Sequence, residues 1–319
     1  MRGVAAIVVM LIHMGGEPAR WLSGGYLAVD FFFALSGFVL AHAYGARVTG
    51  TGDFLKARAI RLYPLYLAGL VLGVCAALAT GMPSTQIITA LLLGLFFLPA
   101  PGSALYPLDP PAWSLFFELV ANATWFPLRR ILAGPMAATL IMLGALGVLA
   151  SDIAYGAVSA GGYWNNIGGG FARVGFSFLA GVLIHQFWRR GKGWPRMPGL
   201  LVIAGLLGVL AAPLPRQLFD PVAVLVLMPA LVFLGSCCAS ANGMLDWVQR
   251  QLGAASYAVY ALHFPVIVIV DRLLIPRLAI AHPSLVTSPL TLVIVVGAAL
   301  LIDKLYDQPV RRWLTAFRR

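Results

Sequence analysis

Eleven stretches of mostly apolar residues, each 15 to 23 residues long, follow one another along this chain of 319 residues. A helix of about 20 apolar residues spans the hydrocarbon core of a bilayer. Hydrophobic residues make up 61% of the chain and charged residues only 10%, whereas soluble domains are about a quarter charged. The pattern therefore predicts an all-α, polytopic membrane helical bundle. The stretches are 3–20, 26–45, 61–80, 86–100, 111–128, 131–150, 170–188, 198–215, 219–238, 253–275 and 285–306.

The basic residues between these stretches indicate how the chain crosses the membrane. The loop 46–61 and the pair at 129–130 are both basic, so both are expected on the cytoplasmic side. That placement needs an even number of crossings between them, yet three apolar stretches lie there. The stretch 86–100 is short and ends in LPAPG, and PLDPPAW follows. We therefore predict a broken or re-entrant element at 98–113, covered by protein or lining a watery cavity.

About ten transmembrane helices remain, which places the N and C termini on the cytoplasmic side. We expect residues 1–319 to form a single integral-membrane domain without a soluble domain, in a bacterial inner (cytoplasmic) membrane. The first stretch begins with an arginine, as signal peptides often do, but it lacks a clear A-x-A cleavage site. We therefore interpret it as a retained membrane helix.

Clusters of Lys and Arg in short loops account for the net charge of +11 through the positive-inside rule. The sequence has no basic groove interleaved with aromatic residues, so we expect no nucleic-acid partner. The three cysteines have neither zinc nor redox spacing, and no histidine has a second ligand at metal-binding spacing. We therefore expect no metal, and membrane lipid as the surrounding partner.

Ionisable residues within apolar stretches are costly in a membrane, so each is a candidate site residue. Arg2 and His13 are eleven residues apart, which on a helix returns to nearly the same face about 16 Å along the axis. Arg2 at the cytoplasmic headgroups could bind a phosphate-bearing ligand, and His13 near mid-membrane could act as a general base. The alternative is a topogenic arginine and a histidine hydrogen-bonded to another helix, and spacing alone favours neither.

Two more motifs place charges near the apolar stretches. Arg58 and Arg61 are one helical turn apart in FLKARAIRLYPLY, a spacing that suits a phosphate or diphosphate, although the positive-inside rule would also supply arginines here. Glu118, in PPAWSLFFELV, is the only glutamate inside an apolar stretch. It could pair with an arginine, orient His13 or bind a substrate hydroxyl, and the competing interpretation is a structural ion pair.

Two further stretches carry polar side chains with less specific signals. Asp30 is expected near the outer end of its helix, and Ser36 with Gly37 permits close helix contact, which is the default interpretation. Tyr260 and His263 lie on roughly one face of their helix, and a lone histidine of this kind is most often a packing residue.

Taken in order, these motifs resemble the membrane acyltransferase type 3 family over almost the whole chain. The matches are Arg2-x10-His13, VDFFFALSGF, the Arg58 and Arg61 pair followed by LYPLY, WSLFFE ending at Glu118, SYAVYALH ending at His263, and YDQPVRRW. In the last motif family members usually show a glutamate where this chain has Asp307.

The resemblance implies an enzyme that moves an acyl group, often acetyl, from cytoplasmic acyl-CoA to a hydroxyl of a sugar, polysaccharide or lipid acceptor. It implies that His13 activates the hydroxyl or carries the acyl group transiently, with Arg2 and Glu118 beside it in the active centre. The CoA phosphates would bind to Arg2, Arg58 and Arg61. The residues then expected to contact substrate are Asp30, Ser36, Trp113, Ser114, Tyr260 and His263.

Two other functions fit parts of the sequence. A transporter or flippase of a lipid-linked sugar would explain the helices and the intramembrane Glu118 and His13. It gives less reason for arginines clustered near His13 on the cytoplasmic side, and no inverted repeat is visible. A structural membrane subunit gives no reason for any buried ionisable group.

Overall fold

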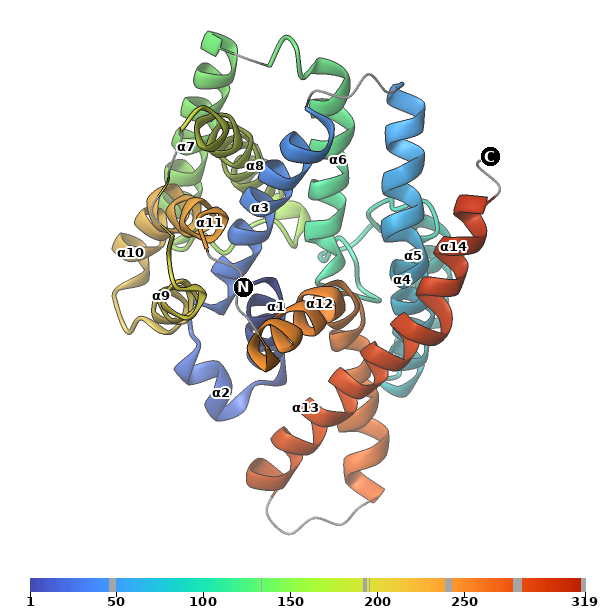
Figure 1. Ribbon diagram of the computed structural model, residues 1–319. Helices are drawn as coiled ribbons and strands as arrows, with labels where there is room; N and C mark the ends of the chain where they lie inside the picture. The colour runs from blue at the N-terminus through green and yellow to red at the C-terminus, as the bar shows by residue number, and fades with distance from the viewer. Residues whose placement is uncertain are drawn as a thin grey trace.

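Helices dominate the computed structural model, which describes residues 1–45, 50–132, 134–191, 194, 196–238, 243–277 and 283–316. The first four residues of the basic loop 46–61 thus lie outside the described residues. Figure 1 shows the arrangement. The α-helices are α1 Arg2–Met14, α2 Gly16–Trp21, α3 Ala28–Tyr44, α4 Thr51–Ala79, α5 Ser84–Gly94, α6 Ala112–Leu128, α7 Gly134–Tyr155, α8 Ile167–Arg190, α9 Gly199–Ala211, α10 Arg216–Val222, α11 Met228–Ser236, α12 Met244–Ile269, α13 Pro283–Ile302 and α14 Gln308–Ala316.

Short π-helical turns join some of these helices into longer rods. Ala223–Leu227 links α10 to α11, and Asp303–Asp307 links α13 to α14. Within the described residues, seven helical rods are long and apolar enough to cross a membrane, and three apolar helices are shorter. The predicted all-helical fold is therefore confirmed, and the long apolar rods are consistent with a polytopic membrane bundle. The count of about ten crossings and the cytoplasmic termini stay predictions.

The first apolar stretch forms a shorter helix than predicted. α1 ends at Met14 because Gly15 and Gly16 both adopt positive φ, at 71° and 64°, a backbone conformation that glycine adopts without strain. The 13 residues of α1 span about 20 Å, less than the hydrocarbon core. α1 packs against α12 near the middle of the bundle (Figure 1), and His13 lies in its last turn.

The predicted interruption of the helices is present between α5 and α6. No helix covers residues 95–111, and the backbone there finds partners elsewhere, as buried peptide groups must. Tyr66 and Tyr106 donate their hydroxyls to the carbonyls of Gly94 and Phe97, at 2.7 Å each. Leu105 N donates to Gly162 O, at 3.0 Å, which ties the segment to the loop before α8.

Two glycines allow α3 and α8 to cross in close contact. A Cβ atom at Gly37 would overlap the carbonyl oxygen of Phe178, and one at Gly181 would overlap the carbonyl oxygen of Ala34. Small residues permit such close approach between membrane helices. The close contact predicted at Gly37 is therefore confirmed. The contact with α8 fixes the position of α3, and Ser36 lies on the face of α3 next to Gly37.

Replacing Gly181 by valine should destabilise the protein, because the added side chain must force the two helices apart. Overpacking of this kind costs about 1–3 kcal/mol, which would appear as a lower Tm of the purified protein in detergent. The matched control is Gly175→Val on the same helix, where a Cβ would meet no atom within 4 Å. Equal melting of the two variants would contradict the proposed steric role.

Candidate functional site

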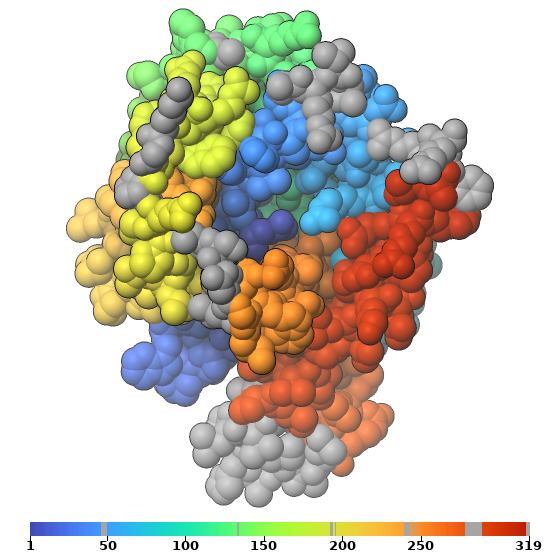
Figure 2. All heavy atoms as spheres, viewed as in Figure 1, coloured from blue at the N-terminus to red at the C-terminus, as the bar shows by residue number. Residues whose placement is uncertain are grey.

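A cavity of about 290 Å³ lies between α1, α3, α4, α6 and α12. It adjoins the end of α3 and the first turns of α4, which flank the basic loop predicted to be cytoplasmic. Figure 2 shows this face hollowed between α3 and α4 (blue) and α12 (orange). The charged and polar lining residues are Arg2, Ser36, Tyr44, Arg58, Arg61, Ser114, Glu118, Ser256, Tyr257 and Tyr260.

Glu118 is held in the cavity wall by two partners. α6 presents Ser114 and Glu118 on one face because they are four residues apart. Ser36 Oγ on α3 donates to Glu118 Oε1 at 2.7 Å, and Arg58 Nη2 on α4 forms an ion pair with the same oxygen at 2.8 Å. The predicted pairing of this carboxylate with an arginine is thus present, and one residue connects three helices.

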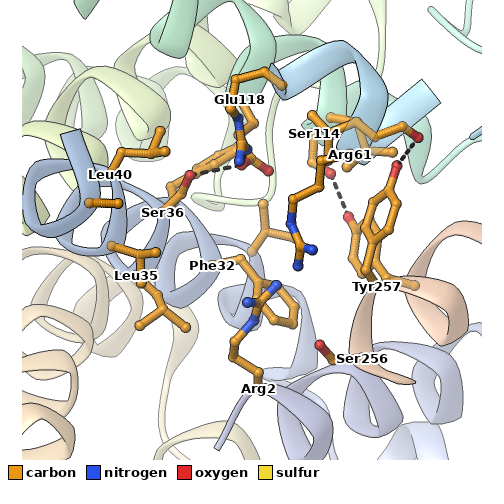
Figure 3. A pocket seen from close by; sticks show the side chains of 18 of the residues that line it. Arg2, Phe32, Leu35, Ser36, Leu40, Arg61, Ser114, Glu118, Ser256 and Tyr257 are labelled. Carbon is orange, nitrogen blue, oxygen red and sulfur yellow. Dashed lines mark hydrogen bonds and ion pairs between the residues drawn. The ribbon is translucent and has the colours of Figure 1, made fainter. Parts of the chain in front are cut away.

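Two further guanidinium groups enter the cavity without such a partner. Figure 3 shows the guanidinium groups of Arg2 and Arg61 turned toward each other. Within the described residues neither forms a hydrogen bond or an ion pair with a protein group, and Arg2 Nε is buried. Two cations facing each other repel, and the buried Nε of Arg2 lacks an acceptor, which is costly. The cavity therefore has the charge and geometry of an anion site, with three arginines and one carboxylate.

His13 lies outside the cavity lining and contacts a second histidine. His13 Nδ1 is 2.7 Å from the carbonyl oxygen of Val9 and 3.3 Å from His263 Nε2 on α12. Tyr260, which lines the cavity, has its ring centroid 5.8 Å from that of His263 and 5.6 Å from that of Phe32, another lining residue. The two histidines therefore lie next to an aromatic residue of the cavity lining.

The partners of Glu118 and His13 are separate. Glu118 contacts Ser36 and Arg58, whereas His13 contacts Val9 O and His263. In this arrangement Glu118 does not orient His13, which was one of the three roles expected for it.

Ser114 and Tyr260 form a direct contact, with their oxygens 2.5 Å apart. Both line the cavity, on α6 and α12. Together with Ser36, they are the predicted substrate contacts that the structure brings into the cavity.

Asp30 and Trp113 lie elsewhere, around a buried arginine on α8. Arg173 binds both carboxylate oxygens of Asp30, at 3.1 and 2.6 Å, and both side chains are at most 1% exposed. The same guanidinium donates to the carbonyls of Ala160 and Tyr26 and lies 5.3 Å from the centre of the Trp113 ring. This network ties α3 to α8 and leaves the Asp30 carboxylate fully engaged.

Arg173 and Tyr257 are absent from the set predicted from the sequence. Arg173 is a cation inside the apolar stretch 170–188, so the cost of an intramembrane charge would have identified it as it identified Glu118. Tyr257 lines the cavity and donates its hydroxyl to the carbonyl of Leu62, at 2.6 Å. Nothing in the sequence distinguishes Tyr257 from other tyrosines in membrane helices.

Comparison with known proteins gives a consistent set of relatives. A family model described as an acyltransferase domain matches residues 1–303. The "Exopolysaccharide production protein ExoZ" of Rhizobium meliloti (strain 1021) is 28% identical over 270 residues, which cover 80% of this chain and 80% of that protein. "Acyltransferase MdmB" of Streptomyces mycarofaciens is 28% identical over 328 residues, covering 91% and 82%.

A third relative is more similar over a shorter region. "Protein 2 in picA locus" of Rhizobium radiobacter is 45% identical over 148 residues, which cover 39% of this chain and 77% of that protein. No solved structure gives a significant match.

The buried ion pair yields a stability prediction. Arg173→Met leaves the Asp30 carboxylate buried without a counter-charge, which costs about 3–5 kcal/mol. We expect a large drop in Tm in detergent, and partial recovery in the double variant Asp30→Leu/Arg173→Met, which removes both charges. Arg20→Met is the control, because Arg20 and Glu17 form an exposed pair. Unfolding of Arg173→Met at the wild-type temperature would contradict this role.

Proposed function

The chain belongs to the acyltransferase 3 family, and we propose that it transfers an acyl group from acyl-CoA, bound at the arginine cavity, to a hydroxyl of a carbohydrate acceptor. Family membership makes it an enzyme that transfers acyl groups, and its seven long apolar helical rods indicate an integral membrane protein. The observation that carries the choice of donor is the pair of facing, unpaired guanidinium groups of Arg2 and Arg61.

The donor is proposed from the charge it would bring to this cavity. Coenzyme A carries a diphosphate, and phosphate oxygens accept the paired N–H groups of arginine. An anion between Arg2 and Arg61 would relieve their mutual repulsion and satisfy the buried Nε of Arg2. Arg58 adds a third cation, kept in place by Glu118. Glu118 therefore acts in this scheme by positioning Arg58.

The size of the cavity limits how much of the donor it can hold. Small-molecule sites usually measure about 300–1,000 Å³, and this cavity, at about 290 Å³, lies just below that range. It would hold the diphosphate and the start of the pantetheine arm, with the nucleoside outside on the side of the basic loop. The apolar lining residues Phe32, Leu35 and Leu40 suit an uncharged arm.

His13 is proposed as the group that handles the proton. It takes the proton of the acceptor hydroxyl, whose oxygen attacks the thioester carbonyl carbon. The carbon–sulfur bond then breaks, and the departing thiolate takes the proton back from His13, so that ester and free CoA are the products. Arg2 and His13 are about 16 Å apart along α1, a distance that the extended pantetheine arm is suited to bridge.

The acceptor class is proposed from the relatives. One of them is named as an exopolysaccharide production protein, and it aligns with 80% of this chain. A carbohydrate hydroxyl reaching His13 would meet polar groups of Ser114 and Tyr260 nearby. These two residues are proposed to form hydrogen bonds with the acceptor.

Loss of the Arg61 guanidinium should weaken donor binding. A hydrogen bond to a charged group contributes about 1.5–3 kcal/mol, so Arg61→Gln should raise the Kd for acetyl-CoA about 10- to 100-fold. Arg61→Lys should recover only part of this, because lysine keeps the charge but loses the bidentate geometry. Equilibrium binding of labelled acetyl-CoA to the protein in lipid would measure both effects.

The matched control for donor binding is Arg20→Gln, which removes an exposed arginine paired with Glu17 and should leave the Kd unchanged. If Arg61→Gln binds acetyl-CoA like the wild type, the cavity is not the donor site.

Removing the proposed base should abolish transfer but not donor binding. We expect His13→Ala to bind acetyl-CoA with wild-type affinity, because His13 lies outside the cavity lining. Its rate of label transfer to an added glycolipid should fall about 10²- to 10⁴-fold, the usual contribution of general base catalysis. Wild-type transfer rates in this variant would exclude His13 as the base.

The rival function is tested with the wild-type protein. If the wild type neither binds the donor nor transfers the acyl group, and instead flips a lipid-linked sugar, the protein is a transporter.

A further inference from the structure

The contact between the two histidines assigns a role to His263. We infer that His263 is a positioning residue, which holds the proton of His13 on Nδ1 and so leaves Nε2 as the nitrogen that reacts with the acceptor hydroxyl. The inference rests on the proposed function for its catalytic consequence, but the pairing itself can be measured without turnover.

The hydrogen bonds of His13 determine where its proton lies. A carbonyl oxygen only accepts hydrogen bonds, and Val9 O is 2.7 Å from His13 Nδ1. In this ring orientation Nδ1 therefore carries the hydrogen. In the neutral ring Nε2 then has a free lone pair, which a general base requires.

The same reasoning shows which ring nitrogen of His263 carries the hydrogen. Its Nδ1 is 2.8 Å from the carbonyl oxygen of Tyr260 and 3.2 Å from that of Val259, so its hydrogen also lies on Nδ1. Its Nε2 faces His13 Nδ1 at 3.3 Å. A doubly protonated His263 would direct an N–H group against the N–H group of His13. The geometry is therefore that of a neutral His263, which accepts a second, weaker hydrogen bond from His13.

No charged side chain among the described residues pairs with His13 or His263. His263 is fully buried, and within the described residues no carboxylate forms an ion pair with either ring. Phe264 covers His13 edge-on, with ring centroids 5.8 Å apart. In serine proteases a buried aspartate holds the tautomer of the catalytic histidine and stabilises its imidazolium form. Here the lone pair of His263 and the carbonyl of Val9 are the two acceptors that serve His13.

This arrangement has a consequence during the reaction. When His13 takes the hydroxyl proton on Nε2, the positive charge spreads to Nδ1–H and strengthens its hydrogen bonds to His263 Nε2 and Val9 O. The interaction is thus stronger in the transition state than in the ground state, which raises kcat rather than donor affinity.

The test compares two variants of the full-length protein in lipid. His263→Gln retains an acceptor oxygen, whereas His263→Leu removes it at similar size. Free thiol release is followed with acetyl-CoA as donor and octyl glucoside, below its critical micelle concentration, as hydroxyl acceptor. We expect His263→Leu to lower kcat about 10- to 100-fold, part of the contribution of general base catalysis, with the KM for acetyl-CoA unchanged. His263→Gln should stay within about fivefold of the wild type.

A spectroscopic measurement separates positioning from simple packing. With histidine labelled by nitrogen-15, the chain has five histidines, and His13→Ala assigns the resonances of His13. We expect a protonated Nδ1 and an unprotonated Nε2 in the wild type and in His263→Gln. We expect mixed tautomers in His263→Leu, because without its second acceptor the ring is free to rotate away from Val9 O. Acetyl-CoA binding serves as the test of folding for each variant.

The outcomes distinguish this inference from the proposed function. Unchanged kcat and an unchanged tautomer in His263→Leu would overturn the positioning role, and so would equal losses in the leucine and glutamine variants. If the wild type releases no thiol, the proposed function fails, and the nitrogen-15 spectra still decide whether His263 sets the tautomer of His13.

Discussion

The high cost of an unpaired charge in apolar surroundings organises this structure. Asp30 is neutralised by Arg173, and Glu118 by Arg58. Each pair joins helices that are distant in the sequence, so the pairs fix how the bundle assembles. Arg2 and Arg61 do not follow this rule, since they face each other across the cavity. We propose that the compensating anion in this cavity would come from a ligand.

The helices position these groups through close contacts and interruptions. Gly37 and Gly181 bring α3 against α8, so that Ser36 reaches Glu118 on α6. The segment 95–111 continues the turns of α5 only as far as Leu98, and its backbone is also tied to tyrosine hydroxyls and to the loop before α8. α6 begins where this segment ends. The irregular segment thus determines where α6 begins, and hence where along the helix Ser114 and Glu118 face the cavity.

The proposed chemistry divides between two places in the bundle. The arginine cavity would bind the donor, and the His13–His263 pair, next to Tyr260, would handle the proton. α1 belongs to both, because Arg2 lies in its first turn and His13 in its last. α12 contributes Tyr260 to the cavity and His263 to the pair. A shift of α1 against α12 would therefore change both sites together.

The sequence by itself determined the helical membrane fold, the break before α6 and the small set of polar residues worth examining. The reason is that backbone hydrogen bonds must be satisfied within the hydrocarbon core, and charged side chains there are costly. Only the tertiary structure decided the pairings: Glu118 with Arg58 across 60 positions, His13 with His263 across 250, and Asp30 with Arg173 rather than with the cavity. The physical reason is that the lipid-facing and the buried surfaces of a membrane helix are both apolar. The contrast between a polar and an apolar face, which shows how a helix of a soluble protein is rotated, is therefore weak here. The rotation of each helix, and hence the partner each polar side chain meets, follows from packing.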